Sequence, residues 1–178
     1  MIRSIFKILA MLVALCFAMG TSNAQSKAFG ANFSITGAGF SYEHYVDNNS
    51  FLSLKLCLDA DDLMWLRATD PGASASLVWN MVFKEKTSVY GNKISFFAGP
   101  GIMAGYVTDL SNTAGAAFGL MGRVGLECRF QRPVMLSVSL SPILGCHITT
   151  EKEEVRMRLY KSGLLQFVIP EIGIKYAF

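Results

Sequence analysis

Hydrophobic and polar residues alternate along most of the chain with a period of two, which is the pattern of a β-strand with two unlike faces. The final segment shows the alternation well. One of its faces carries Val168, Ile172, Ile174, Tyr176 and Phe178, and the opposite face carries Glu171, Gly173, Lys175 and Ala177. Such an alternation predicts a strand with one apolar environment and one polar environment.

Eight segments carry this alternation, and we therefore expect eight strands, of which the first is short. They cover residues 29–34, 40–43, 52–58, 74–83, 94–105, 123–130, 134–147 and 168–178. Tight turns are expected at 47–50 and 131–133, with a moderate connection at 85–92. Mostly longer connections are expected at 59–72, 108–114 and 149–162. Short turns on one side and longer loops on the other are typical of outer-membrane barrels, whose longer loops lie outside the cell.

The composition agrees with a barrel rather than with membrane helices. Hydrophobic residues make up 52% of the chain, yet no apolar run after the first 24 residues is long enough to span a bilayer as a helix. Helices and closed barrels are the structures that satisfy every backbone group within lipid. The sequence thus predicts an all-β fold: an eight-stranded antiparallel transmembrane β-barrel.

The polar face is expected to line the lumen. It is rich in Gly and Ser, and an eight-stranded barrel has an interior just wide enough to be filled by side chains. It also carries charges of both signs that could pair within the lumen, as buried charges must. These residues are Glu43, Lys55, Arg123, Glu127, Arg129, Glu171 and Lys175. The alternative is a soluble barrel of the lipocalin kind, in which the polar face is the solvated outside.

The first 24 residues have the features of a cleaved secretory signal peptide. Arg3 and Lys7 precede an apolar run at 8–19, and the small residues Ser22 and Ala24 mark a cleavage site before Gln25. We therefore expect the barrel to occupy residues 25–178. Without Arg3 and Lys7 the chain keeps 14 basic and 13 acidic residues, a near balance that gives no reason to expect a nucleic-acid partner.

The residues give no indication of a metal or another cofactor. The remaining cysteines, Cys57, Cys128 and Cys146, lack the spacing of a zinc site and are too few and too far apart for a disulfide framework. The acidic stretch at 59–62 lacks the spacing and the glycine of a calcium-binding loop.

The ending Gly173-Ile174-Lys175-Tyr176-Ala177-Phe178 resembles the terminal signal of outer-membrane barrels, and the stretch 39–45 is similar to small outer-membrane barrel proteins of Bacteroidota. The resemblance covers essentially the whole chain after residue 24. It implies a location in the cell outer membrane and contact with outer-membrane lipid and lipopolysaccharide. It also implies that the barrel-assembly machinery reads Tyr176 and Phe178, and that other outer-membrane proteins are possible partners.

His147 and Thr149 are weak candidates for catalysis. Their spacing loosely resembles the His-x-Ser pair of outer-membrane lipid-A deacylases, and residues two apart share a strand face. The hydroxyl residue here is Thr, no matching acidic residue is obvious, and the flanking residues of that family are missing. A polar histidine near the rim of the lumen is the simpler interpretation.

The segment 151–161 is a candidate for surface contacts. Val155, Met157 and Leu159 alternate with Arg156 and Arg158, which predicts a projecting hairpin and a break near Ser162-Gly163. The two arginines could meet lipopolysaccharide phosphates or a protein partner. Trp65, in the connection 59–72, is a further candidate.

From these features we expect a structural or interaction role: envelope integrity, adhesion or a subunit of an outer-membrane assembly, and not an open pore. Two alternatives remain, an enzyme that modifies lipid A or phospholipid and a soluble periplasmic lipid-binding barrel.

Overall fold

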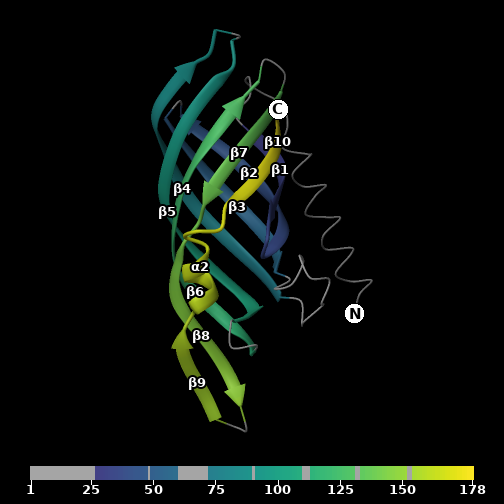
Figure 1. Cartoon of the computed structure of the whole chain (residues 1–178), viewed down its shortest axis with the longest axis vertical. Coiled ribbons are helices and arrows are strands. Elements are labelled where there is room, and N and C mark those ends of the chain that lie inside the picture. Colours follow the sequence, from purple (N-terminus) through teal and green to yellow (C-terminus); the bar gives the residue numbers. More distant parts are fainter. Residues whose placement is uncertain are drawn as a thin grey trace, which may run out of the picture.

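The computed structural model describes residues 27–47, 49–59, 72–89, 91–109, 113–130, 133–151 and 154–178. Its strands all belong to one antiparallel sheet (Figure 1). They are β1 (Lys27–Ser34), β2 (Gly37–Asp47), β3 (Ser50–Asp59), β4 (Gly72–Thr87), β5 (Lys93–Thr108), β6 (Ala114–Arg129), β7 (Val134–Leu140), β8 (Ile143–Glu151), β9 (Glu154–Leu159) and β10 (Glu171–Ala177). One short helix, α2 (Lys161–Leu165), lies between β9 and β10.

The sheet closes on itself and forms the predicted eight-stranded antiparallel barrel. Neighbouring strands pair in chain order from β1 to β6, and β10 returns to pair with β1. The seventh strand of the barrel consists of β7 and β8, because β6 pairs with both of them in succession. The eighth consists of β10, which pairs with β7, and β9, which pairs with β8.

One of the two divided strands differs from the sequence prediction, and the division of the other was expected. A continuous strand was expected at 134–147, but it is interrupted at Ser141 and Pro142, where proline removes a ladder N–H. The break near Ser162-Gly163 was expected, and α2 occupies it. Backbone hydrogen bonds join the wall on either side of α2. Tyr160 N donates to Gly145 O at 2.9 Å, and Ser141 N donates to Gln166 O at 3.4 Å.

The strands on either side of residues 88–92 and 109–113 are longer than the alternation predicted. β4 continues to Thr87, which shortens the connection expected at 85–92. β6 begins at Ala114, well before the expected strand at 123–130. Residues 114–122 contain many glycines and alanines, which weaken the apolar signal of an outward face.

The barrel has two distinct ends. The terminal end holds Lys27, Phe178 and the turns β2–β3, β4–β5 and β6–β7, and the loop end holds the β1–β2 turn, the β5–β6 loop and the β8–β9 hairpin. Figure 1 shows the β8–β9 hairpin extending well beyond the other strands. The strand ends beside the short turns expected at 47–50 and 131–133 therefore lie at the same end as the C-terminus.

The predicted assignment of faces is confirmed. Polar residues of the inward face are buried, including Asn32, Ser53 and Ser137. Large apolar residues of the outward face are exposed, including Phe83, Leu120 and Leu144. Among the residues that the structure describes, no helix is both long enough and apolar enough to cross a membrane.

Candidate functional site in the barrel lumen

The centre of the lumen is occupied by Lys175, whose side chain is fully buried. Its Nζ lies 2.7 Å from Glu43 Oε1 and 2.9 Å from Glu127 Oε2. The three residues come from β10, β2 and β6, so their ion pairs reach from one part of the wall to another. Buried charges persist in a folded protein when they are paired and hydrogen-bonded, and this triad meets that condition.

Arg123 connects this triad to a second ion pair. Its Nη1 donates to Ser53 Oγ at 3.0 Å and lies 3.7 Å from Glu43 Oε1, and its Nη2 lies 4.0 Å from Glu171 Oε1. Glu171 in turn accepts a hydrogen bond from Lys55 Nζ. The guanidinium also stands over the ring of Phe97, 5.4 Å from its centroid, which adds a cation–π contact.

Arg129 lies at the edge of the network, toward the terminal end. Its Nη2 is 3.7 Å from Glu127 Oε1, and its guanidinium lies 5.0 Å from the ring centroid of Tyr45. The Tyr45 hydroxyl lies 3.1 Å from Glu127 Oε1 and 3.2 Å from Glu43 Oε2, and its single proton can be donated to either carboxylate. The structure therefore brings together all seven charged residues selected from the sequence, four basic and three acidic, in one connected set.

Tyr45 and Phe51 were not singled out from the sequence. The ring of Phe51 lies 5.2 Å from that of Tyr45 and 5.3 Å from that of Phe97, so three aromatic rings pack beside the charges. Tyr45 shares its strand parity with Glu43, and this parity was the signal that could have placed it in the lumen. Phe51 precedes the alternating Leu row of β3 and shares the parity of Ser53.

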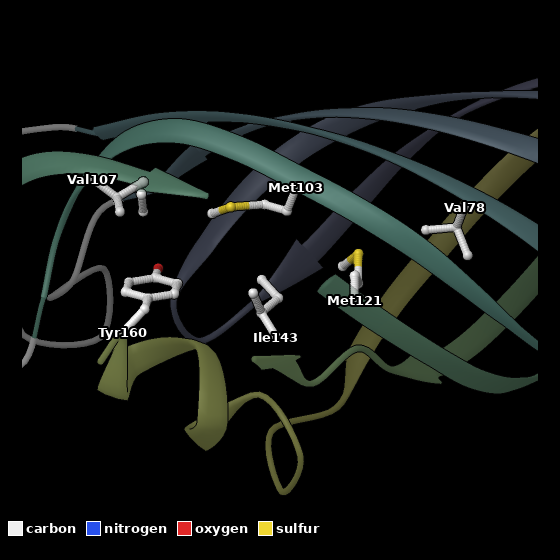
Figure 2. Packing of buried hydrophobic residues seen from close by; sticks show 7 residues of the cluster. Val78, Met103, Val107, Met121, Ile143 and Tyr160 are labelled. Atoms are coloured by element: carbon white, nitrogen blue, oxygen red, sulfur yellow. The ribbon is translucent and has the colours of Figure 1, made fainter. Parts of the chain in front are cut away.

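The lumen is not polar along its whole length, which refines the expectation of a polar filling. Toward the loop end its inward residues form an apolar layer (Figure 2). The layer consists of Val78, Met103, Val107, Ala117, Met121, Ile143 and Tyr160. Among the described residues, a charged layer and an apolar layer thus occupy successive parts of the lumen.

Segment 160–163 fills the break in the barrel wall beside the apolar layer. Asp109, at the start of the β5–β6 loop, is buried and its Oδ1 accepts hydrogen bonds from Ser162 N at 2.8 Å and from Ser162 Oγ at 3.0 Å. This carboxylate satisfies an N–H group in the first turn of α2, where the N-cap residue Tyr160 makes no side-chain cap. This contact could not be predicted from the sequence, because its partners are 53 residues apart.

The two catalytic candidates lie side by side on the inward face of β8. His147 is buried, with Nε2 3.1 Å from Val107 O and its ring stacked on that of Tyr160 at 6.0 Å. Thr149 is also buried, and its Oγ1 has no hydrogen-bond partner among the described residues. Among the described residues, no acidic side chain forms a hydrogen bond with His147. The described residues therefore show neither a carboxylate that orients the histidine nor a solvent-accessible nucleophile.

Two cavities adjoin the filled lumen. The larger, of about 350 Å³, lies at the terminal end, where its lining includes Tyr45, Phe51, Phe97 and Arg129. The smaller, of about 30 Å³, lies beside the apolar layer, and Met103, Met121 and Ile143 help to line it. The smaller has room for a few water molecules and none for an acyl chain.

The remaining candidates lie on the surface. Arg156 and Arg158 are exposed on β9, and Tyr176 and Phe178 are exposed on the outward row at the terminal end. Trp65, Asp61, Asp62 and the proposed signal peptide lie outside the described residues. Within the described ranges, no group of three or more His, Cys, Asp or Glu side chains could hold a metal ion.

Comparison of the chain with models of protein families, with curated proteins and with solved structures finds no significant match. Function must therefore be argued from the barrel and its contacts.

Proposed function

We propose that the protein is a small barrel of the bacterial outer membrane with a structural or interaction role, and that it does not form an open pore. The observation that carries the proposal is the apolar outward face. Soluble monomers rarely expose apolar patches beyond a few hundred Å². Here large apolar side chains are exposed on every strand of the barrel wall, as lipid contact requires.

Exposed aromatic side chains near both ends of the wall support the same proposal. Those toward the terminal end are Phe83, Phe96, Phe130, Tyr176 and Phe178, and those toward the loop end are Tyr106, Phe118 and Phe167. Aromatic rings gather at the two interfaces of outer-membrane barrels, where a ring meets both lipid tails and headgroups.

The filled lumen supports the absence of a pore. Ion pairs cross the charged layer, and apolar side chains pack above it within the described strands. A soluble lipid-binding barrel needs an apolar lumen for its ligand, whereas the larger cavity has charged residues such as Asp47, Glu85 and Arg129 in its lining. With a filled lumen, the outer wall and the loop end are the parts available for contact with a partner.

Fractionation tests the location. In a Gram-negative host the protein should pellet with outer membranes, resist extraction with carbonate and migrate differently on a gel before and after boiling. Recovery in the soluble periplasmic fraction would contradict the proposal. In planar bilayers the purified barrel should show no stable conductance, and a reproducible channel would contradict a closed lumen.

A second candidate function, an enzyme acting on lipid A or phospholipid, rests on the adjacent inward side chains of His147 and Thr149. Mass spectrometry of lipid A and phospholipid from a strain without the gene, and from one with His147→Ala, tests it. A modified lipid A or phospholipid species that disappears in both strains would favour the enzymatic function.

A further inference from the structure

Strand β9 has one edge, called the free edge below, that is not paired with any other described strand. Its other edge pairs with β8. The direction of its backbone groups follows from one hydrogen bond, in which Tyr160 N donates to Gly145 O. Alternate residues of a strand direct their N–H and C=O groups to opposite edges. The groups of Arg156 and Arg158 therefore point to β8, and those of residues 155, 157 and 159 point to the free edge.

The two faces of β9 differ sharply. Arg158 lies opposite His147 and Arg156 lies opposite Thr149, so the arginines continue the inward face of the barrel beyond its loop end. The other face carries Val155, Met157 and Leu159, which are 72%, 60% and 49% exposed. Because the hairpin projects past the other strands (Figure 1), a further strand has access to this edge.

We propose that the free edge of β9 binds an extended acidic segment of another protein by β-strand addition. Backbone groups of residues 155, 157 and 159 would form the ladder with the incoming strand. Carboxylates at alternate positions of that strand would face Arg156 and Arg158, and apolar side chains at the intervening positions would cover Met157 and its neighbours.

Three registers that pair this edge with a second copy of the chain bring its arginines together. Antiparallel pairing centred on Arg156 places the two Arg156 side chains opposite each other, and pairing centred on Arg158 does the same with Arg158. Pairing centred on Met157 places Arg156 opposite Arg158 twice. Like charges directly opposite one another destabilise a sheet, and charged edges protect proteins from self-association. The same arginines favour an acidic strand.

The inference rests on the proposed interaction role, but its test requires only the folded barrel. Loss of peptide binding by a barrel that fractionates with outer membranes would refute the inference alone. A barrel found in the soluble fraction would refute the proposed location and leave the peptide measurement valid.

The probe is a fluorescent peptide of about seven residues, the length of a typical strand, with alternating glutamate and valine. Its binding to the purified protein in mild detergent is followed by fluorescence anisotropy. Strand addition predicts that N-methylation of the amides along one peptide edge abolishes binding, while methylation along the other edge leaves it intact. Replacing glutamate with glutamine should weaken binding about fivefold at low salt.

Variants of β9 complete the test. Met157→Pro removes an N–H from the free edge and spares the ladder with β8, so it should weaken binding about tenfold, whereas the matched variant Met157→Ala should change it little. The double variant Arg156→Gln and Arg158→Gln should weaken binding of the glutamate peptide about fivefold, the same loss that is expected when glutamine replaces glutamate in the peptide. Heat-modifiable migration shows that each variant is folded.

Several results would overturn the inference. They are equal effects of methylation on both edges, equal binding of the glutamine peptide, and unchanged binding by Met157→Pro. Concentration-dependent dimerisation that Met157→Pro abolishes would identify a second copy as the occupant. Arginine-dependent binding to vesicles containing anionic phospholipid, without binding of the peptide, would identify a lipid surface.

Discussion

Lys175 and Glu43 form an ion pair of 2.7 Å inside the barrel, although 132 residues separate them in the sequence. β1 lies between their strands, and its register places Gly30 opposite Lys175. A side chain at Gly30 would collide with the lysine, because its Cβ would lie 2.6 Å from Lys175 Cγ. The missing side chain at position 30 therefore leaves room for the lysine stem to pass over β1 and reach the carboxylate.

Removing the lysine charge should destabilise the barrel strongly. Lys175→Met would leave Glu43 and Glu127 buried with too little positive charge, and loss of one partner from a buried ion pair costs about 3–5 kcal/mol. Urea unfolding of the barrel in detergent micelles, followed by tryptophan fluorescence, measures the change.

Lys93→Met is the matched control. Lys93 pairs with Glu85 at 3.0 Å, but the lysine side chain is 56% exposed, so the free energy of unfolding should fall by less than about 1 kcal/mol. Equal effects of the two substitutions would mean that the central ion pairs contribute no more than a surface pair.

Two glycines of β6 should respond differently to the same substitution. A Cβ at Gly125 would lie 2.7 Å from Phe97 Cζ and 2.8 Å from Ser139 Cβ, so Gly125→Ala should lower the free energy of unfolding by about 1–3 kcal/mol. A Cβ at Gly122 would have Pro142 Cγ at 3.8 Å as its nearest neighbour, an ordinary contact. Gly122→Ala should therefore be nearly neutral in the same urea titration, and a larger loss at Gly122 would contradict this packing of the lumen.

The alternation of residues along the strands was enough to predict the barrel, its closure with eight strands and the inward position of all seven charges. The face of the sheet on which a residue lies is a local property, because successive residues of a strand point to opposite faces. The partners of those charges are not local. That Lys175 meets Glu43 and Glu127, rather than Glu171, depends on register and on which strands are adjacent.

The apolar layer and the contact between Asp109 and Ser162 escaped prediction for a related reason. Met103 and Met121 have inward parity, but sequence alone does not show that they stand at the same height as Ile143 and Tyr160. Depth along the barrel axis follows from the stagger between strands, which the residues of one strand do not encode.

A charge on the outward face distinguishes a lipid-facing wall from a solvated one. Leu120 lies near the middle of β6 and is 68% exposed, so Leu120→Arg should lower the stability of the barrel in phospholipid vesicles by about 2–4 kcal/mol. Thr87→Arg, at the terminal end of β4, should cost at most about 1 kcal/mol, since charges near the interface are tolerated. The measurement is urea titration of the vesicle-inserted protein. A protein that folds in buffer without lipid and tolerates Leu120→Arg would instead have a solvated outer wall.

Asp109 should control the local stability of α2 with little influence on the charged layer. Asp109→Ala removes the acceptor of two hydrogen bonds from Ser162, and a hydrogen bond to a charged group contributes about 1.5–3 kcal/mol. Amide hydrogen exchange of residues 161–165 should accelerate in this variant, while exchange in β2 and β10, which carry Glu43 and Lys175, should stay nearly as slow as in the unmodified protein. Asp109→Asn keeps an oxygen acceptor and should accelerate exchange less. Unchanged exchange of α2 in Asp109→Ala would mean that the packing of Tyr160 and Ile143, rather than the carboxylate, holds the segment in place.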